Sequence, residues 1–243
     1  DTIINGYGQD GSTITGGTGD DYITNEGGYV LYQYSSGDGN DFIGGFDESS
    51  TLKITSGTVD SVTSDGTDLF IAVGEGTITL ANAYELENIN IVDANGSLVA
   101  VSEITLTDGV DSLNNHFNSV KINALAGNDI ISNDGSNVTI DGGNGNDNIT
   151  NDGEGSDING GEGNDTITNN GNNSAINGGA GDDSIVNHAG YYDDEISTIN
   201  GGLGNDVITH DGNALFVEYA AGDGNDLING FRSEEHTSEL QSL

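Results

Sequence analysis

The chain has 243 residues, of which 40 are glycine, 41 are Asp or Glu and only 3 are Lys or Arg, so its formal net charge is −38. It has no cysteine, which excludes disulfides, thiolate zinc sites and cysteine nucleophiles. The charge disfavours nucleic acid and anionic membranes as partners and favours a cation, and no apolar run approaches the roughly 18 residues of a membrane span.

Residues 1–45 are predicted to be the end of a first β-roll. Gly16-Gly-Thr-Gly-Asp-Asp-Tyr-Ile-Thr24 has the nine-residue pattern Gly-Gly-x-Gly-x-Asp-x-aliphatic-x, and a weaker copy surrounds Asp41. Glycine tolerates positive φ, so Gly-Gly-x-Gly indicates a tight loop. The polar–aliphatic–polar triplet after the aspartate is typical of a short strand with one buried face.

Residues 46–105 contain less glycine and are predicted to be a β-rich cap. Strands are expected at 51–55, 68–73, 77–80, 88–92 and 98–101, with a hairpin turn at Gly74-Glu-Gly76. Such a segment would cover the unpaired strand edges and apolar residues at the open end of a roll.

Residues 106–231 are predicted to be a second β-roll. Four ungapped copies of the nonapeptide begin at Gly142, Gly160, Gly178 and Gly201, and weaker copies surround Asp111, Asp129 and Asp226. Plainer nonapeptides lie between them, with Asn-Asp-Gly or Asn-Asn-Gly at the opposite turn, so one coil has eighteen residues, two turns and two short strands. A coil can bury only one or two aliphatic side chains, so the coils must stack into parallel ladders with an isoleucine core.

The end of the chain contains a repeat and a foreign tail. Residues 219–231 repeat residues 34–46 with 9 of 13 residues identical, so the larger unit of roll plus cap begins again. Residues 232–243 resemble a translated sequencing adapter, and we expect them to be disordered or a short helix without functional meaning.

Stacked coils would place the sixth-place aspartates of the pattern in a row, each roughly 5 Å from the next. Such a row repels itself unless a cation lies between neighbours. Calcium suits the loop better than magnesium, because it accepts 6–8 oxygens, backbone carbonyls included, in loose geometry. No His or Cys joins the row, so zinc or copper is not indicated.

These repeats resemble the haemolysin-type (RTX) calcium-binding nonapeptide repeats of secreted bacterial proteins, over residues 1–44 and 106–231. The resemblance implies an all-β fold, a right-handed parallel β-roll or β-helix in two stretches with the β-rich cap between them. It also implies several Ca²⁺ ions between successive coils, export by type I secretion, and an extracellular or bacterial cell-surface location.

The chain departs from the family pattern at one edge, because the Asn-Asp-Gly and Asn-Asn-Gly turns carry no second Gly-x-Asp. The resemblance therefore implies metal ligands along one edge only, in a single row of ions. The residues implied are Asp21, Asp41, Asp111, Asp129, Asp147, Asp165, Asp183, Asp206, Asp226, Gly17, Gly19, Gly143, Gly145, Gly161, Gly163, Gly179, Gly181, Gly202 and Gly204.

The preferred interpretation is a non-enzymatic, calcium-binding structural segment of a large secreted or surface protein, which folds on meeting extracellular calcium. Two alternatives stay open: an adhesin or glycan-binding module, or the non-catalytic RTX part of a secreted enzyme or toxin. Gly6-Tyr-Gly-Gln-Asp-Gly11 matches a dinucleotide fingerprint but lacks the following helix, and the histidines are dispersed on turns, so we expect no catalytic residue and no further cofactor.

Overall fold

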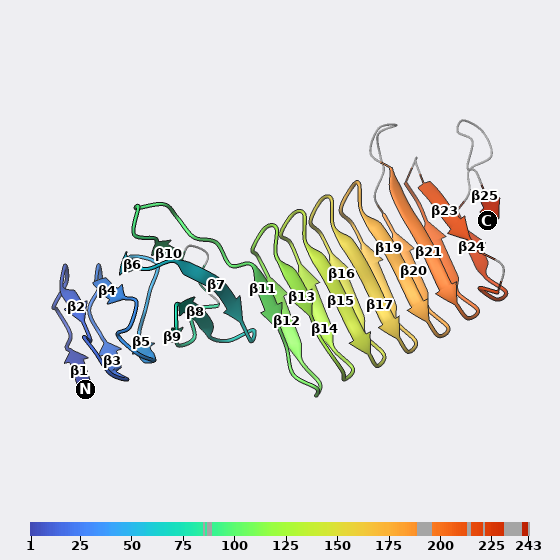
Figure 1. Ribbon diagram of the computed structural model, residues 1–243. Helices are drawn as coiled ribbons and strands as arrows, with labels where there is room; N and C mark the ends of the chain where they lie inside the picture. Colours follow the sequence, from blue (N-terminus) through green and yellow to red (C-terminus); the bar gives the residue numbers. More distant parts are fainter. Residues whose placement is uncertain are drawn as a thin grey trace. The chain divides into compact units, whose positions relative to one another are not determined.

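The computed structural model describes residues 1–84, 86, 89–188, 196–212, 215–220, 222–230 and 240–242. In this part of the chain all regular secondary structure is β-strand, and most strands stack in parallel ladders, so the prediction of an all-β parallel solenoid is confirmed (Figure 1). The chain divides into two compact units, unit 1 (Asp1–Ile104) and unit 2 (Thr105–Leu243). None of the described residues forms a helix long and apolar enough to cross a membrane.

Unit 1 begins with coils about 20 residues long. Its first strands are β1 (Thr2–Asn5), β2 (Thr13–Thr15), β3 (Tyr22–Asn25), β4 (Leu31–Ser35) and β5 (Asp41–Gly44). β1, β3 and β5 form one parallel ladder, in which Ile23 lies between Ile3 and Ile43, and β2 pairs with β4 in a second ladder. Ile23 and Ile43 are buried, as the alternation of polar and aliphatic residues predicts.

The second part of unit 1 caps these coils. It contains β6 (Thr51–Ser56), β7 (Val59–Ser64), β8 (Leu69–Val73), β9 (Gly76–Leu80), β10 (Asn90–Val92) and β11 (Glu103–Thr105). β6 extends the ladder of β4 and β9 extends that of β5, while β7, β8 and β9 pair antiparallel and β11 lies parallel to β7. The cap therefore pairs with both strands of the last coil, β4 and β5.

Most of the predicted cap strands are confirmed. The hairpin turn is found between β8 and β9, where Val73 lies opposite Gly76 and Gly74 has a φ of 65°. β10 covers the described end of the 88–92 prediction, while residues 87 and 88 lie outside the described residues. The strand predicted at 98–101 is wrong: Leu98 makes only an isolated bridge to Val92, because the chain turns back at 93–97 through hydrogen bonds to Asp93.

Unit 2 consists of two parallel ladders joined by alternating turns. One ladder contains β13 (Lys121–Asn123), β15 (Thr139–Asn144), β17 (Asp157–Glu162), β19 (Ala175–Ala180), β21 (Ser197–Leu203) and β23 (Leu215–Tyr219). The other contains β12 (Ser112–Asn115), β14 (Ile130–Asn133), β16 (Asn148–Asn151), β18 (Thr166–Asn169), β20 (Ser184–Asn187), β22 (Val207–His210) and β24 (Leu227–Asn229).

The core of unit 2 is two isoleucine columns, one from each ladder. In the first, Ile122, Ile140, Ile158, Ile176 and Ile199 pair in register, and in the second Ile131, Ile149, Ile167, Ile185 and Ile208 do so. All ten side chains are at most 3% exposed. The columns fix the stacking register, because a slip of one residue would turn every isoleucine toward solvent.

The expectation for the tail is wrong for the three of its residues that the structure describes. Leu240–Ser242 forms β25, which pairs parallel with Val217–Tyr219 of β23. The physical reason is that the edge of β23 presents unpaired backbone groups, which accept an extended segment of almost any sequence. The rest of the tail, 232–239 and 243, lies outside the described residues.

Candidate functional site

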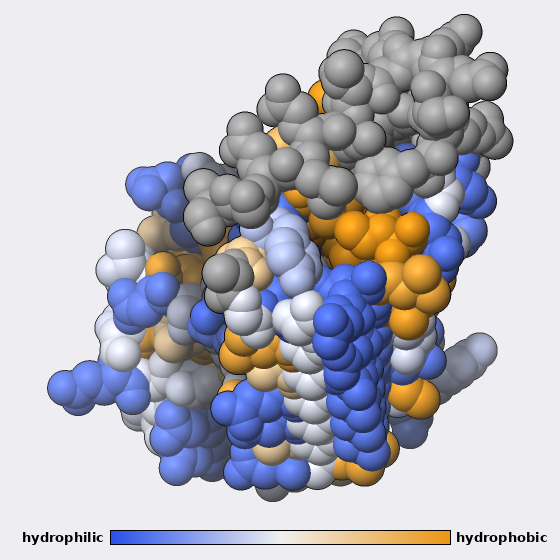
Figure 2. Space-filling model, turned by 90° about the vertical axis from the view of Figure 1, so that its right-hand side faces the viewer, coloured by the Kyte–Doolittle hydropathy of each residue, from blue (hydrophilic) through white to orange (hydrophobic). Residues whose placement is uncertain are grey.

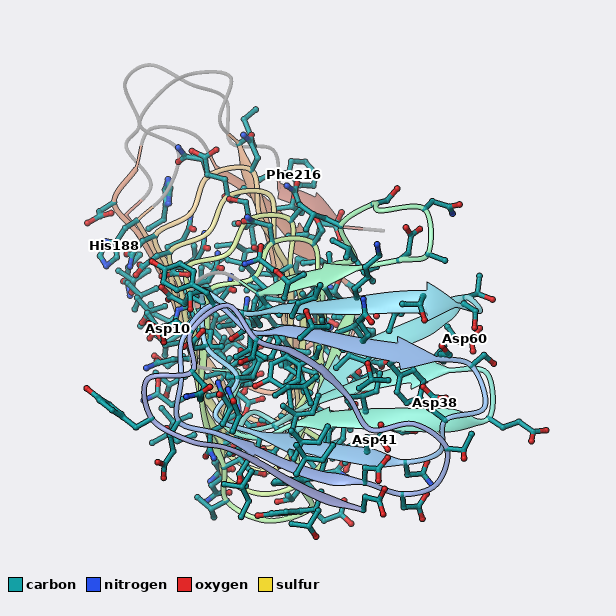
Figure 3. The ribbon with its side chains drawn as sticks, turned by 90° about the vertical axis from the view of Figure 1, so that its left-hand side faces the viewer. Asp10, Asp38, Asp41, Asp60, His188 and Phe216 are labelled. Carbon is teal, nitrogen blue, oxygen red and sulfur yellow. The ribbon has the colours of Figure 1, made fainter. Side chains whose placement is uncertain are left out.

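The strands of the β12–β24 ladder carry different polar residues at their two ends. Each begins directly after a sixth-place aspartate, and β12, β14, β16, β18 and β20 end at an asparagine. We call the first end the aspartate edge, which consists in unit 2 of Asp111, Asp129, Asp147, Asp165, Asp183, Asp206 and Asp226, and in unit 1 of Asp21 and Asp41. In unit 1 this edge lies at the right of Figure 3, where Asp38 and Asp41 are labelled, and Asp10 lies at the opposite edge.

The predicted row of aspartates is present in the fold, with one carboxylate per coil. Asp129, Asp147, Asp165, Asp183 and Asp206 are 1–2% exposed, and Asp21 and Asp41 are 3% and 6% exposed. Five consecutive coils of unit 2 therefore bury a carboxylate at the same position.

One oxygen of each carboxylate joins its coil to the coil before. Oδ1 of Asp165 accepts a hydrogen bond of 2.8 Å from the backbone N–H of Asp147. In the same way, the backbone N–H of Asp165 donates to Oδ1 of Asp183. The same bond links every successive pair from Asp111 to Asp226, at 2.8–3.0 Å, and links Asp21 to Asp41 at 3.1 Å. The spacing of the aspartates thus equals the spacing of the coils.

The other oxygen has no partner. Oδ2 is buried without a hydrogen-bond partner in Asp21, Asp129, Asp147, Asp165, Asp183 and Asp206. Asp111 ends the row differently, because its Oδ2 accepts hydrogen bonds from the backbone N–H and the hydroxyl of Thr107 at 3.0 and 2.8 Å. Burying a carboxylate oxygen without a partner is costly, so each of these atoms requires a proton or a cation.

The glycines of the pattern leave the turns beside these oxygens free of side chains. The second-place and fourth-place glycines have φ between 91° and 144°, the left-handed region that glycine tolerates. They are Gly17, Gly19, Gly143, Gly145, Gly161, Gly163, Gly179, Gly181, Gly202 and Gly204. The first-place Gly160 has no space for a side chain, since a Cβ would overlap both Oδ2 of Asp165 and the carbonyl oxygen of Gly178 in the next coil.

The donor set fits a hard cation held mainly by oxygen. Within the described residues no three His, Cys, Asp or Glu side chains come close enough to bind a metal together. A cation at this edge would therefore take its remaining ligands from backbone carbonyls, which calcium accepts readily and zinc does not. The ion pairs found in the described part of the chain involve only the N-terminal amine and two histidines, so no Lys or Arg neutralises the row there.

Burial raises the pKa of the five buried carboxyl groups of the row in unit 2. The pKa of Asp147 rises from 3.8 to about 6 and that of Asp183 to about 7, chiefly through loss of hydration; the hydrogen bond from the preceding backbone N–H opposes the rise and neighbouring carboxylates add to it. The pKa values of Asp129, Asp165 and Asp206 shift upward for the same main reason. In the absence of a cation, the fold favours a proton on the row.

The opposite edge is an asparagine ladder, for which the sequence predicted only turns. We call it the asparagine edge: Asn115, Asn133, Asn151, Asn169 and Asn187 in unit 2, all at most 1% exposed. Nδ2 of Asn151 donates to Oδ1 of Asn169 at 2.7 Å and to the carbonyl of Gly153 at 2.8 Å. The other four donate to the next coil in the same way, except that Asn187 contacts Nδ1 of His210. The 18-residue spacing of these asparagines is the signal that could have revealed the ladder.

The comparisons with known proteins show no family for this chain. No family model matches it, and no curated protein matches it. Among solved structures it is similar to the extracellular lipase LipA from Serratia marcescens, with 18% identity, a TM-score of 0.30, and coverage of 77% of this chain and 30% of that chain. The chain thus spans under a third of the length of that protein, and the site is interpreted from its own residues.

Proposed function

We propose that this chain is a calcium-binding structural segment of a secreted or cell-surface bacterial protein, and that its rolls fold when extracellular calcium binds along the aspartate edge. The observation that carries the proposal is the row of buried Oδ2 atoms without partners, repeated in five consecutive coils of unit 2. A sequence without a cation ligand would not be expected to bury the same unpaired oxygen in five successive coils.

The residues that would hold the ions are the sixth-place aspartates and the carbonyl groups of the Gly-Gly-x-Gly turns. Both are hard oxygen donors, and the turn conformation allows two coils to contribute to one ion. When bound, the ion supplies positive charge to a row that no Lys or Arg neutralises in the described part of the chain.

The energetics favour folding outside the cell. Calcium at ten times a site's dissociation constant contributes about 1.4 kcal/mol per site, so five sites contribute about 7 kcal/mol, comparable to the stability of a whole domain. Extracellular modules typically bind calcium with dissociation constants of roughly 10⁻⁴–10⁻³ M, far above the calcium concentration of a cytosol. The resemblance to haemolysin-type repeats supports the same order of events, export of the open chain followed by folding. We assign no catalytic role to these residues.

Circular dichroism in calcium tests this proposal. Titration from a chelator into millimolar calcium is expected to produce a cooperative gain of β signal, and magnesium at the same concentration a much smaller one. A spectrum that is identical in chelator and in calcium would contradict the proposal.

A matched pair of variants assigns the effect to the row. Asp165→Asn removes one anionic oxygen from the aspartate edge, while Asp157→Asn removes the same charge from an exposed position on β17. The calcium midpoint is expected to rise for Asp165→Asn and to stay unchanged for Asp157→Asn, since general charge reduction is the same in both.

A further inference from the structure

The coil that the cap covers in unit 1 occurs a second time at the end of unit 2. Residues 219–231 repeat residues 34–46, and both copies contain the same local hydrogen bonds. Tyr34 donates its hydroxyl to the carbonyl of Gly39 and Tyr219 to that of Gly224; the backbone N–H of Ser35 is bound by Asp38, and that of Ala220 by Asp223.

Both copies also dock on the preceding coil in the same way. Oδ1 of Asp41 accepts the N–H of Asp21 at 3.1 Å, and Oδ1 of Asp226 accepts the N–H of Asp206 at 3.0 Å. The two coils are therefore equivalent in structure as well as in sequence.

In the described residues, both strands of the first copy are paired with the cap, whereas of the second copy only β23 has a further strand, β25, beside it. In unit 1, β6 pairs with β4 and β9 pairs with β5, and Tyr34, Asp41 and Ile43 are buried at 2%, 6% and 3% exposure. In unit 2, Tyr219, Asp226 and Ile228 are only partly buried, and Leu227 is 56% exposed. No strand in the described part of the chain pairs with the outer edge of β24. Figure 2 faces this end of the molecule and shows apolar residues (orange) on it beside columns of hydrophilic ones (blue).

The strand β25 shows that this end accepts a cap strand in the register of unit 1. Leu240 lies opposite Val217, and Leu52 of β6 lies opposite Tyr32, which is the residue equivalent to Val217. Position 240 thus corresponds to position 52 of the cap.

We infer that the outer face of β23 and β24 is a docking surface for a second cap segment with the sequence pattern of residues 47–104, paired through strands equivalent to β6 and β9. In unit 1 the fit depends on Gly76, whose Cα lies so close to Tyr34 and Gly39 that a Cβ would overlap the tyrosine hydroxyl and the glycine carbonyl. Thr77 adds a hydrogen bond of 3.1 Å from its backbone N–H to Oδ1 of Asn40, whose equivalent in unit 2 is Asn225. The inference concerns strand pairing and does not depend on which cation the aspartate edge binds.

The test replaces residues 232–243 of the full chain with a second copy of residues 47–104, joined directly after Phe231. Amide hydrogen exchange across Leu227–Asn229 in calcium is expected to slow by about tenfold or more, toward the rate of Asp41–Gly44 in the same molecule. Asp41–Gly44 serves as the internal reference, because its own cap is unchanged.

A control chain carries Gly76→Val only in the appended copy. Exchange across Leu227–Asn229 is expected to remain as fast in this control as in the parent chain. The inference is overturned if the unaltered appended cap leaves that exchange fast, or if the Gly76→Val cap slows it equally.

Discussion

The two edges of unit 2 join successive coils through hydrogen bonds of different chemistry. At the asparagine edge, the buried amides of Asn115, Asn133, Asn151 and Asn169 each donate to the next coil and to their own turn, so the column carries no charge there. At the aspartate edge, one oxygen of each carboxylate binds the preceding coil and the other is left buried and unpaired. From Asn115 to Asn169 the asparagine edge is therefore satisfied by the chain itself, and in the described residues its unpaired buried atom is Nε2 of His210 at the end of the column, while the aspartate edge leaves one oxygen unpaired in each of five successive coils.

The largest loss of stability is expected when the asparagine ladder is interrupted. Asn151→Ala removes a donor to Asn169 and Gly153 and leaves the amide of Asn133 without its partner in the next coil. Unsatisfied buried groups of this kind cost about 3–5 kcal/mol together, and the loss should be the same in calcium and in chelator at pH 5, where protons on the aspartate edge favour the folded state. Urea unfolding monitored by circular dichroism measures it, with the exposed Asn148→Ala on the same strand as control. A loss that depends on calcium would break the distinction between the edges.

A smaller effect whose sign depends on calcium is expected at the aspartate edge. Asp165→Asn keeps an oxygen to accept the N–H of Asp147 but replaces the unpaired anionic oxygen. In calcium the variant should lose about 1–2 kcal/mol, because one site is weakened. In chelator at pH 5, where protons on the row favour the folded state, it should be at least as stable as the parent, because a buried ionisable group is removed. Loss of stability under both conditions would indicate that the carboxylate acts through packing alone.

The pH dependence of stability also distinguishes the aspartate edge from the asparagine edge. In chelator, the folded-state pKa of about 6 for Asp147 and about 7 for Asp183 exceeds the ordinary 3.8, so the folded state binds protons that the unfolded chain has released. The free energy of unfolding should therefore fall as the pH rises from about 5 to 8. Calcium competes with those protons, so the stabilisation by calcium should increase over the same range. Thermal melts at pH 5 and pH 8, with calcium and with chelator, measure both slopes, and equal slopes would contradict the prediction.

The smallest effect is expected outside the asparagine ladder, at the exposed pair of His188 and Asp211, 2.9 Å apart. Asp211→Asn should change stability by less than about 0.5 kcal/mol, because exposed ion pairs contribute little. Chemical denaturation measures the change. A larger loss would mean that the outer side chains of this edge, and not only its buried amides, hold the coils together.

Much of this architecture could be predicted from the sequence, because the nonapeptide fixes several features at once. Its aliphatic residue gives the isoleucine columns, its glycines give the left-handed turns, and its aspartate gives the row at one edge. The role of Asn151 could not be derived from turn chemistry, since Asn-Asp-Gly is a common turn and its amide acts through residues 18 positions away.

The structure differs from the sequence predictions where a segment is a strand or not because of the strand that it can pair with. β7 (Val59–Ser64) has a weak apolar pattern and is a strand because it pairs with β8. Leu98–Val101 has a strand-like sequence but makes only one bridge. Leu240–Ser242 is a strand because the edge of β23 accepts it.

The central claim is that a divalent cation completes the aspartate edge, and a crystal structure of the chain grown in calcium tests it most directly. The account predicts anomalous difference peaks for calcium in one row, each roughly 2.3–2.6 Å from Oδ2 of a sixth-place aspartate and from carbonyl oxygens of neighbouring turns. Coils folded as described here, with those Oδ2 atoms bound only by water or by protons at neutral pH and millimolar calcium, would contradict it.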